Sequence, residues 1–323
     1  MIEITKKNIR VWSMLGMRRI LGPAMKDIIE QDRKVLFATA DTGRYYAYDD
    51  LLRTYPEIVV DVGIAEQNLI GASAGLQNEG FNVYAVTYAT FLTSRALDQI
   101  RVNLGYMGLG VKLIGEAGGM CDGNFSATHM ALEDISNTRN IPNMRVITPA
   151  DGMELVKTLI ALKDAAYPAY VRMTGRFPIP VIYREDYDFE IGKAVTLREG
   201  KDVVILSNGT LLGDVLKTAE MLAEKGVDCK VINLHTVKPL DEALVIDCAK
   251  KTGAVVTVEN HNAVGGLYSA VADCLAANCP TPVGRVAVEE SFGEVGPVDY
   301  LAERFGLTAE HVIAEAEKTL ARK

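Results

Sequence analysis

The 323-residue sequence lacks several features that mark specialised classes of protein. Its five cysteines are scattered and none forms a C-x-x-C pair, so neither a disulfide framework nor a structural zinc site is expected, and a reducing cytoplasm is the expected location. No apolar run approaches the ~20 residues that cross a bilayer, and the opening MIEITKKNIR has no apolar signal-peptide core. Lys and Arg number 34 against 42 Asp and Glu, a net charge of −8 that argues against nucleic-acid binding.

What is present is the composition of a globular protein, with 49% apolar and 24% charged residues over a length typical of about two domains. Short apolar runs alternate with stretches of helical periodicity, which predicts α/β domains with mostly parallel sheets. In the first half, the expected strands are Val35–Ala40, Ile58–Val62, Asn82–Val86, Val111–Ile114 and Arg145–Thr148. The expected helices there are Gly16–Glu30, Ala65–Asn78, Thr90–Asn103 and Asp151–Lys163.

Residues 176–189 contain two prolines and little periodicity, so they are expected to link a domain at 1–175 to a smaller one at 190–323, each with three layers. In the second domain, the expected strands are Asp202–Leu206, Cys229–Asn233, Ala254–Val258 and Arg285–Val288. The expected helices are Gly213–Lys225, Leu240–Lys250, Gly266–Ala276 and Ala309–Arg322.

The strongest local feature is DVGIAEQ at residues 61–67, where a strand ends at Gly63 and a helix starts at Ala65 and Glu66. Ligands of open α/β sheets bind at the carboxyl ends of the strands, which makes Glu66 a candidate functional carboxylate. The alternative is that Glu66 only complements the positive end of the helix dipole.

Further candidates follow the next two strands. Tyr88 and Phe91 are either an aromatic wall beside Glu66 or ordinary core residues, and a carboxyl group against such a wall retains its proton and can donate a hydrogen bond. The glycine-rich loop, residues 115–123, permits close backbone approach to a ligand. His129 suits proton transfer near neutral pH, although a single histidine is more often structural. No group of residues has metal-ligand spacing.

In combination and in order, the motifs resemble the transketolase family, specifically the pyrimidine-binding domain followed by the C-terminal domain. The resemblance runs from about residue 10 to the end of the chain. The segments that carry it are GIAEQ, YATFL, THMALEDI followed by IPNMRVITPAD, VRMTGR and FGEVG.

The resemblance implies transfer of a two-carbon ketol unit from a ketose, phosphorylated in ordinary members, to an aldose with thiamine diphosphate. It implies cofactor-binding roles at Glu66, Tyr88, Phe91 and Arg95, and substrate-binding roles at His129, Arg176 and Asp122. Glu66 is the catalytic residue that would contact N1′ of the aminopyrimidine, and His129 would handle substrate hydroxyl protons. Asp122 lies in a longer loop than the family usually has.

The family mark for diphosphate and Mg²⁺ binding, a GDG run with a downstream asparagine, does not occur in the sequence, where the near match is CDG at residues 121–123. The resemblance therefore implies one subunit of a split transketolase, with an N-terminal partner subunit that provides the diphosphate and Mg²⁺ sites. A homodimer of this chain and a heterotetrameric holoenzyme are expected.

Two alternatives stand beside this interpretation. The β subunit of a thiamine-diphosphate-dependent 2-oxo acid dehydrogenase has the same two domains, but Thr128-His129 followed by ALEDI favours transketolase. A non-catalytic regulatory subunit is disfavoured because all the main candidate site residues are retained together. The triplet Glu259-Asn260-His261, after an expected strand, is assigned a structural or interface role.

Overall fold

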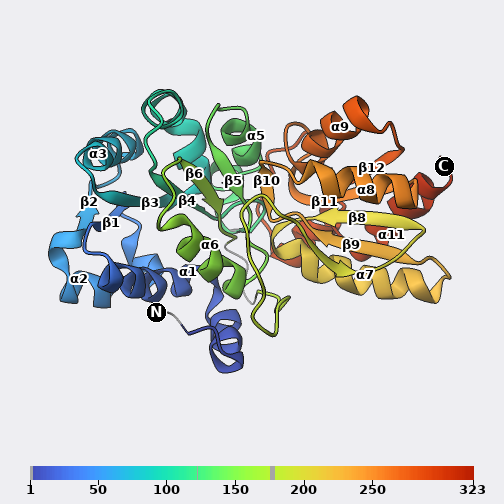
Figure 1. Ribbon diagram of the computed structural model, residues 1–323, viewed down its shortest axis with the longest axis horizontal. Helices are drawn as coiled ribbons and strands as arrows, with labels where there is room; N and C mark the ends of the chain where they lie inside the picture. The colour runs from blue at the N-terminus through green and yellow to red at the C-terminus, as the bar shows by residue number, and fades with distance from the viewer. Residues whose placement is uncertain (1–2, 122, 175–178) are drawn as a thin grey trace.

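The computed structural model describes residues 3–121, 123–174 and 179–323. Two β-sheets lie side by side along the long axis of the molecule, and helices cover both faces of each sheet (Figure 1). The first sheet is built mainly from the blue-to-green half of the chain, and the second from the yellow-to-red half. The expected fold class, two three-layer α/β domains with mostly parallel sheets, is confirmed.

The first sheet has the strand order β10-β5-β6-β4-β3-β1-β2. Its strands are β1 Val35–Thr39, β2 Val59–Asp61, β3 Asn82–Tyr88, β4 Lys112–Glu116, β5 Arg145–Ile147, β6 Ala169–Arg172 and β10 Thr236–Lys238. All paired strands are parallel except β10, which comes from the second half of the chain and pairs antiparallel to β5. This edge strand was not expected from the sequence.

Helices pack on both faces of the first sheet. In Figure 1, α3 and α5 lie on one face, and α1 and α6 lie on the other. The helices of this half are α1 Lys6–Gln31, α2 Asp49–Thr54, α3 Glu66–Asn78, α4 Leu97–Gln99, α5 Asp134–Arg139 and α6 Gly152–Leu162.

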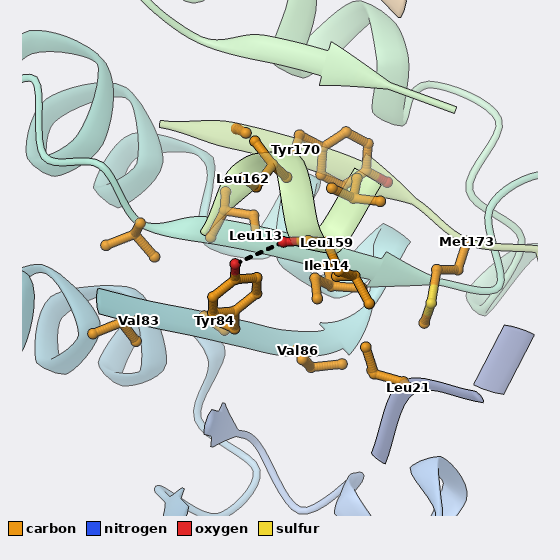
Figure 2. Close-up of a cluster of buried hydrophobic side chains, with 14 of the residues drawn as sticks. Leu21, Val83, Tyr84, Val86, Leu113, Ile114, Leu159, Leu162, Tyr170 and Met173 are labelled. Carbon is orange, nitrogen blue, oxygen red and sulfur yellow. Dashed lines mark hydrogen bonds between the residues drawn. The ribbon is translucent and has the colours of Figure 1, made fainter. Parts of the chain in front are cut away.

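The core between α6 and the first sheet is centred on Tyr84 of β3 (Figure 2). Its hydroxyl donates a 3.0 Å hydrogen bond to the carbonyl of Leu159 in α6, and burial raises the pKa of the Tyr84 phenol above its usual range. Leu113 and Ile114 of β4 are fully buried in the same cluster. Both faces of β3 and β4 are buried, which explains why the central residues of these strands are mainly apolar.

Two helical predictions need correction. The first helix begins at Lys6 rather than Gly16, and Gly16 itself has a φ of 76°, a non-helical conformation that joins two helical segments. The segment before Gly16 is mostly exposed, so its sequence has little apolar periodicity. The stretch predicted as one helix at 90–103 contains two π-helical segments, η3 Phe91–Arg95 and η4 Ile100–Tyr106, around α4. Such wide turns are not visible in the apolar pattern.

The second sheet has the order β12-β11-β8-β9-β7, in which β7 alone is antiparallel to its neighbour. Its strands are β7 Val195–Arg198, β8 Val203–Ser207, β9 Cys229–Asn233, β11 Val255–Asn262 and β12 Val283–Val288. Its helices are α7 Leu212–Glu224, α8 Glu242–Thr252, α9 Leu267–Asn278, α10 Val298–Arg304 and α11 Ala309–Leu320. Within the described parts of the chain, no helix is long and apolar enough to cross a membrane.

The start of α6 ties the two halves together. Asp151, where the sequence predicts that this helix starts, is its N-cap, and its side chain accepts a 2.9 Å hydrogen bond from the Glu154 amide. The other carboxylate oxygen of Asp151 accepts from the amides of Ile182 and Tyr183, both at 2.9 Å. Burial raises the pKa of Asp151 to about 6. One buried carboxylate thus fixes both the helix start and the segment that leads into the second sheet.

Candidate active site

The carboxyl ends of β2, β3 and β4 meet at one edge of the first sheet, and the candidate residues gather there. After β2, Gly63 takes a φ of 71°, a left-handed conformation suited to glycine, and its amide donates to Asp61 at 2.9 Å. This turn leads into α3, whose first residue is Glu66. The Glu66 side chain is buried, with 3% of its surface exposed.

Glu66 is paired with a cation. Nη1 of Arg95, at the end of η3, lies 2.8 Å from Oε2 of Glu66, and the guanidinium also lies 4.3 Å from the centre of the Phe91 ring. The Arg95 side chain is 48% exposed. One of the two interpretations of Tyr88 and Phe91 was an aromatic wall beside Glu66; in the structure, Arg95 contacts both the Glu66 carboxylate and the Phe91 ring.

His129 lies in an aromatic cluster. Its ring centre is 5.1 Å from that of Tyr88, 5.0 Å from that of Phe91 and 4.7 Å from that of Phe125. The Thr128 hydroxyl lies 2.8 Å from His129 Nδ1. The structure thus brings together Tyr88, Phe91 and His129, which the sequence had singled out separately. Phe125 was missed, because nothing in its local pattern distinguishes it from a surface residue.

The glycine-rich loop begins where β4 ends and passes beside this cluster. The amide of Gly118 donates to the Met173 carbonyl at 2.9 Å, and that of Gly119 donates to the Ala131 carbonyl at 2.8 Å. Cys121 is buried in the same small apolar cluster as Tyr88. Two sequence candidates, Asp122 and Arg176, lie outside the described residues.

A second ion pair with a buried carboxylate lies at the same edge and was not expected from the sequence. Nε of Arg18, in α1, lies 2.6 Å from Oε2 of Glu116. Glu116 is the last residue of β4 and is fully buried. The Arg18 guanidinium carbon is 5.9 Å from the centre of the Tyr88 ring, so the pair adjoins the aromatic cluster. The available signal was a charged residue close to the end of an expected strand, at the sheet edge where ligands bind.

The donor set at this edge fits a flat heteroaromatic ring. A buried carboxylate, Glu66, can share a proton with a ring nitrogen, and the rings of Tyr88 and Phe91 offer aromatic surfaces for stacking. The side-chain donors expected around a metal ion are not assembled here: among the residues that the structure describes, no group of three or more His, Cys, Asp or Glu could hold one.

The fold is that of a two-domain α/β protein. The candidate site, at the edge of its first sheet, combines a buried carboxylate and a histidine with aromatic side chains. The model of the transketolase pyrimidine-binding domain matches residues 13–176, and that of the transketolase C-terminal domain matches residues 192–312. The chain therefore belongs to the transketolase family.

Its relatives include subunits of divided enzymes. The chain is 41% identical to the 6-deoxy-6-sulfo-D-fructose transketolase subunit SqwH of Clostridium sp. (strain MSTE9), over 91% of each chain. It is 32% identical to an apulose-4-phosphate transketolase subunit from Phocaeicola vulgatus, over 94% of this chain and 97% of the relative. A solved structure described as a split-gene transketolase in an inactive β4 tetramer matches with a TM-score of 0.88 and 36% identity, over 94% and 98% of the two chains. None of these three is a 2-oxo acid dehydrogenase subunit.

Proposed function

We propose that this chain is the catalytic C-terminal subunit of a split transketolase, which transfers a two-carbon ketol unit from a ketose to an aldose. The observation that carries the proposal is the buried Glu66 carboxylate at the start of α3, at the same sheet edge as Tyr88, Phe91 and His129. A buried acid beside aromatic surface suits a cofactor that must exchange one ring proton with the protein.

The chain's own residues bind and orient the aminopyrimidine of thiamine diphosphate. When bound, the cofactor supplies the electron sink for the two-carbon unit. Glu66 would hold a proton at N1′, and Tyr88 and Phe91 would offer aromatic surface to the ring. Arg95, half-exposed and in contact with both the Glu66 carboxylate and the Phe91 ring, would keep the carboxylate in position.

Substrate binding is assigned to the other side of the aromatic cluster. His129 takes and returns a proton of a substrate hydroxyl, with its Nδ1 beside the Thr128 hydroxyl. The assignments of Asp122 to a ketose hydroxyl and of Arg176 to an anionic tail depend on the resemblance alone. The two relatives are named for a sulfo sugar and a phospho sugar, so the anionic group is a sulfonate or a phosphate. A guanidinium binds either group bidentately.

The holoenzyme requires a partner subunit, which carries the diphosphate and Mg²⁺ ligands. This follows from the missing GDG run and from the relatives' description as subunits. We propose a cytoplasmic α2β2 assembly in which two copies of this chain form the central dimer. Within each copy, residues 176–189 link the two domains. The surface of α3 supports it, because a Cβ at Gly71 or Gly75 would meet nothing within 4 Å and a second helix can approach closely.

The experiment is reconstitution with the partner subunit. The chain alone should bind thiamine diphosphate weakly and show no ketol transfer, and the mixture should be active. A matched sample with Glu66→Ala should assemble with the partner yet stay inactive, which separates catalysis from assembly. Robust turnover by the isolated chain, or release of CO₂ by the mixture from a 2-oxo acid that has no 3-hydroxyl group, such as pyruvate, would exclude the proposal.

A further inference from the structure

We infer that Asn260, at the end of the second sheet, is a positioning residue for the substrate site in the first domain. It acts through the chain between β4 and α5, residues 117–133, hereafter the β4–α5 connection, which carries the glycine-rich loop and His129. The inference rests on the proposed function, because the role it assigns matters only if His129 meets substrate.

The first step is a direct hydrogen bond. Oδ1 of Asn260 accepts from the amide of Met120 at 3.0 Å, a contact between residues 140 positions apart. Gly119, with a φ of 81°, lies so close to Asn260 that a Cβ at Gly119 would stand 2.5 Å from its side-chain amide. The Asn260 carbonyl also accepts from Arg172 Nη2 at 2.9 Å. The loop backbone is therefore pressed against a side chain that belongs to the other sheet.

The second step is that Asn260 is itself held rigidly. Its neighbour Glu259 is buried. The Glu259 carboxylate accepts hydrogen bonds of 2.7 and 2.8 Å from the backbone amides of Leu267 and Tyr268, which start α9. Its other neighbour, His261, is buried, with its Nδ1 2.7 Å from the Asn262 carbonyl. These contacts support the structural or interface role expected of this triplet, and the side chain between the two anchors has little freedom to move.

The third step is that the second domain holds the same connection at further points. Met120, Met130 and Leu132 are buried in the core of the second domain, against residues of β8 and β11. The amide of Gly296 donates to the Gly123 carbonyl at 3.1 Å. His129 precedes Met130, so its position relative to Tyr88 and Phe91 depends on where the second domain holds the chain. The amide of Asn262 also donates to the Leu132 carbonyl at 2.8 Å, and Asn260 adds a side-chain contact to these backbone ones, as a neutral acceptor for the Met120 amide.

The test compares three variants in the reconstituted holoenzyme. Asn260→Leu removes the acceptor at similar size, and Asn260→Asp keeps an acceptor oxygen. Thr252→Val is the matched control. It removes the buried hydrogen bonds of 2.9 and 3.0 Å that the Thr252 hydroxyl donates to the carbonyls of Cys248 and Ala254. Thr252 belongs to the same domain as Asn260 but ends α8 and is not part of the β4–α5 connection. Asn260→Leu should raise the KM for the ketose about tenfold, the effect of one lost buried hydrogen bond, with a smaller change in kcat. Asn260→Asp should have a KM close to that of the wild type, because it keeps the acceptor oxygen. Thr252→Val should leave KM unchanged.

Two further measurements separate this inference from the proposed function. Amide hydrogen exchange of the isolated chain should be faster at Met120 in Asn260→Leu only, and this readout needs no activity. The rate at which the holoenzyme exchanges the thiazolium C2 proton should be unchanged by Asn260→Leu. A wild-type rate no faster than that of the free cofactor would instead overturn the proposed function. The inference is overturned if either the KM or the Met120 exchange is unaffected in Asn260→Leu, or if Thr252→Val raises KM equally.

Discussion

The replacement Glu66→Gln tests the proposed mechanism because its effects on stability and on activity should differ widely. Glutamine keeps the shape of the side chain and a carbonyl oxygen that can accept from Arg95. The lost ion pair joins a buried carboxylate to an arginine that is 48% exposed, so solvent screens it and its contribution is about 1 kcal/mol or less. The free energy of unfolding should therefore change little.

Activity should fall much further. An amide cannot exchange a proton with a ring nitrogen, and the loss of one well-placed acid–base group costs ~10²–10⁴ in rate. At about 1.4 kcal/mol per factor of ten, this corresponds to roughly 3–5 kcal/mol of barrier. The kinetic effect is thus several times larger than the expected effect on folding, and the two can be separated in one set of samples.

The assay is the initial rate of ketol transfer by the reconstituted holoenzyme at saturating thiamine diphosphate and Mg²⁺, together with thermal unfolding of the isolated chain. Glu79→Gln is the matched control, because it makes the same chemical change at the exposed C-cap of the same helix. It should leave both measurements unchanged. A rate for Glu66→Gln within a few-fold of the wild type would show that Glu66 only starts α3, and the proton-transfer argument would be wrong.

Three other outcomes are expected. Arg176→Ala should raise the KM for an anionic substrate about ten- to a hundredfold, from ~1.5–3 kcal/mol of lost charge-assisted bonding, with little effect on the neutral acceptor glycolaldehyde; equal losses would place Arg176 in the scaffold. Asp134→Asn should lower the free energy of unfolding in urea by about 3 kcal/mol, because it leaves the buried Arg172 guanidinium, 2.7 Å away, without its charge partner; a change near zero would contradict this. Burial raises the pKa of Glu259 to about 7 from 4.5, so the stability that its protonated form contributes is lost as pH rises over that interval. Glu259→Gln should therefore gain about 3 kcal/mol relative to the wild type between pH 4.5 and 7, and a difference that does not vary with pH would refute the assignment.

Much of the fold follows from local patterns. Strands such as β1 and β8 are buried on both faces, so they are short, mainly apolar runs with recognisable ends. The start of α6 was predictable because its N-cap, Asp151, is specified by local chemistry. The three-residue strand β10 was not, because its partner β5 lies about ninety residues earlier and three residues define no apolar period.

The candidate site divides in the same way. Glu66, Tyr88 and His129 could be found because each follows a strand or belongs to a family motif, and parallel strands bring their carboxyl ends to one edge. Arg18 could not be connected with Glu116, since their contact depends on how α1 crosses the sheet. The pairing of Arg95 with Glu66 likewise depends on the wide turns of η3, which place a residue of the next crossover beside the start of α3.

The two sheets are not independent modules, and this explains why a substrate site of one domain depends on the other. The second half of the chain contributes β10 to the edge of the first sheet. The first half in turn contributes Met120, Met130 and Leu132 to the core of the second domain. If the chain were cut within 176–189 and the halves separated, the first sheet would lose an edge strand, and the second core would lose the buried side chains of these three residues and of Ala150. The geometry around His129 is therefore a property of the whole chain, which no motif in either half encodes alone.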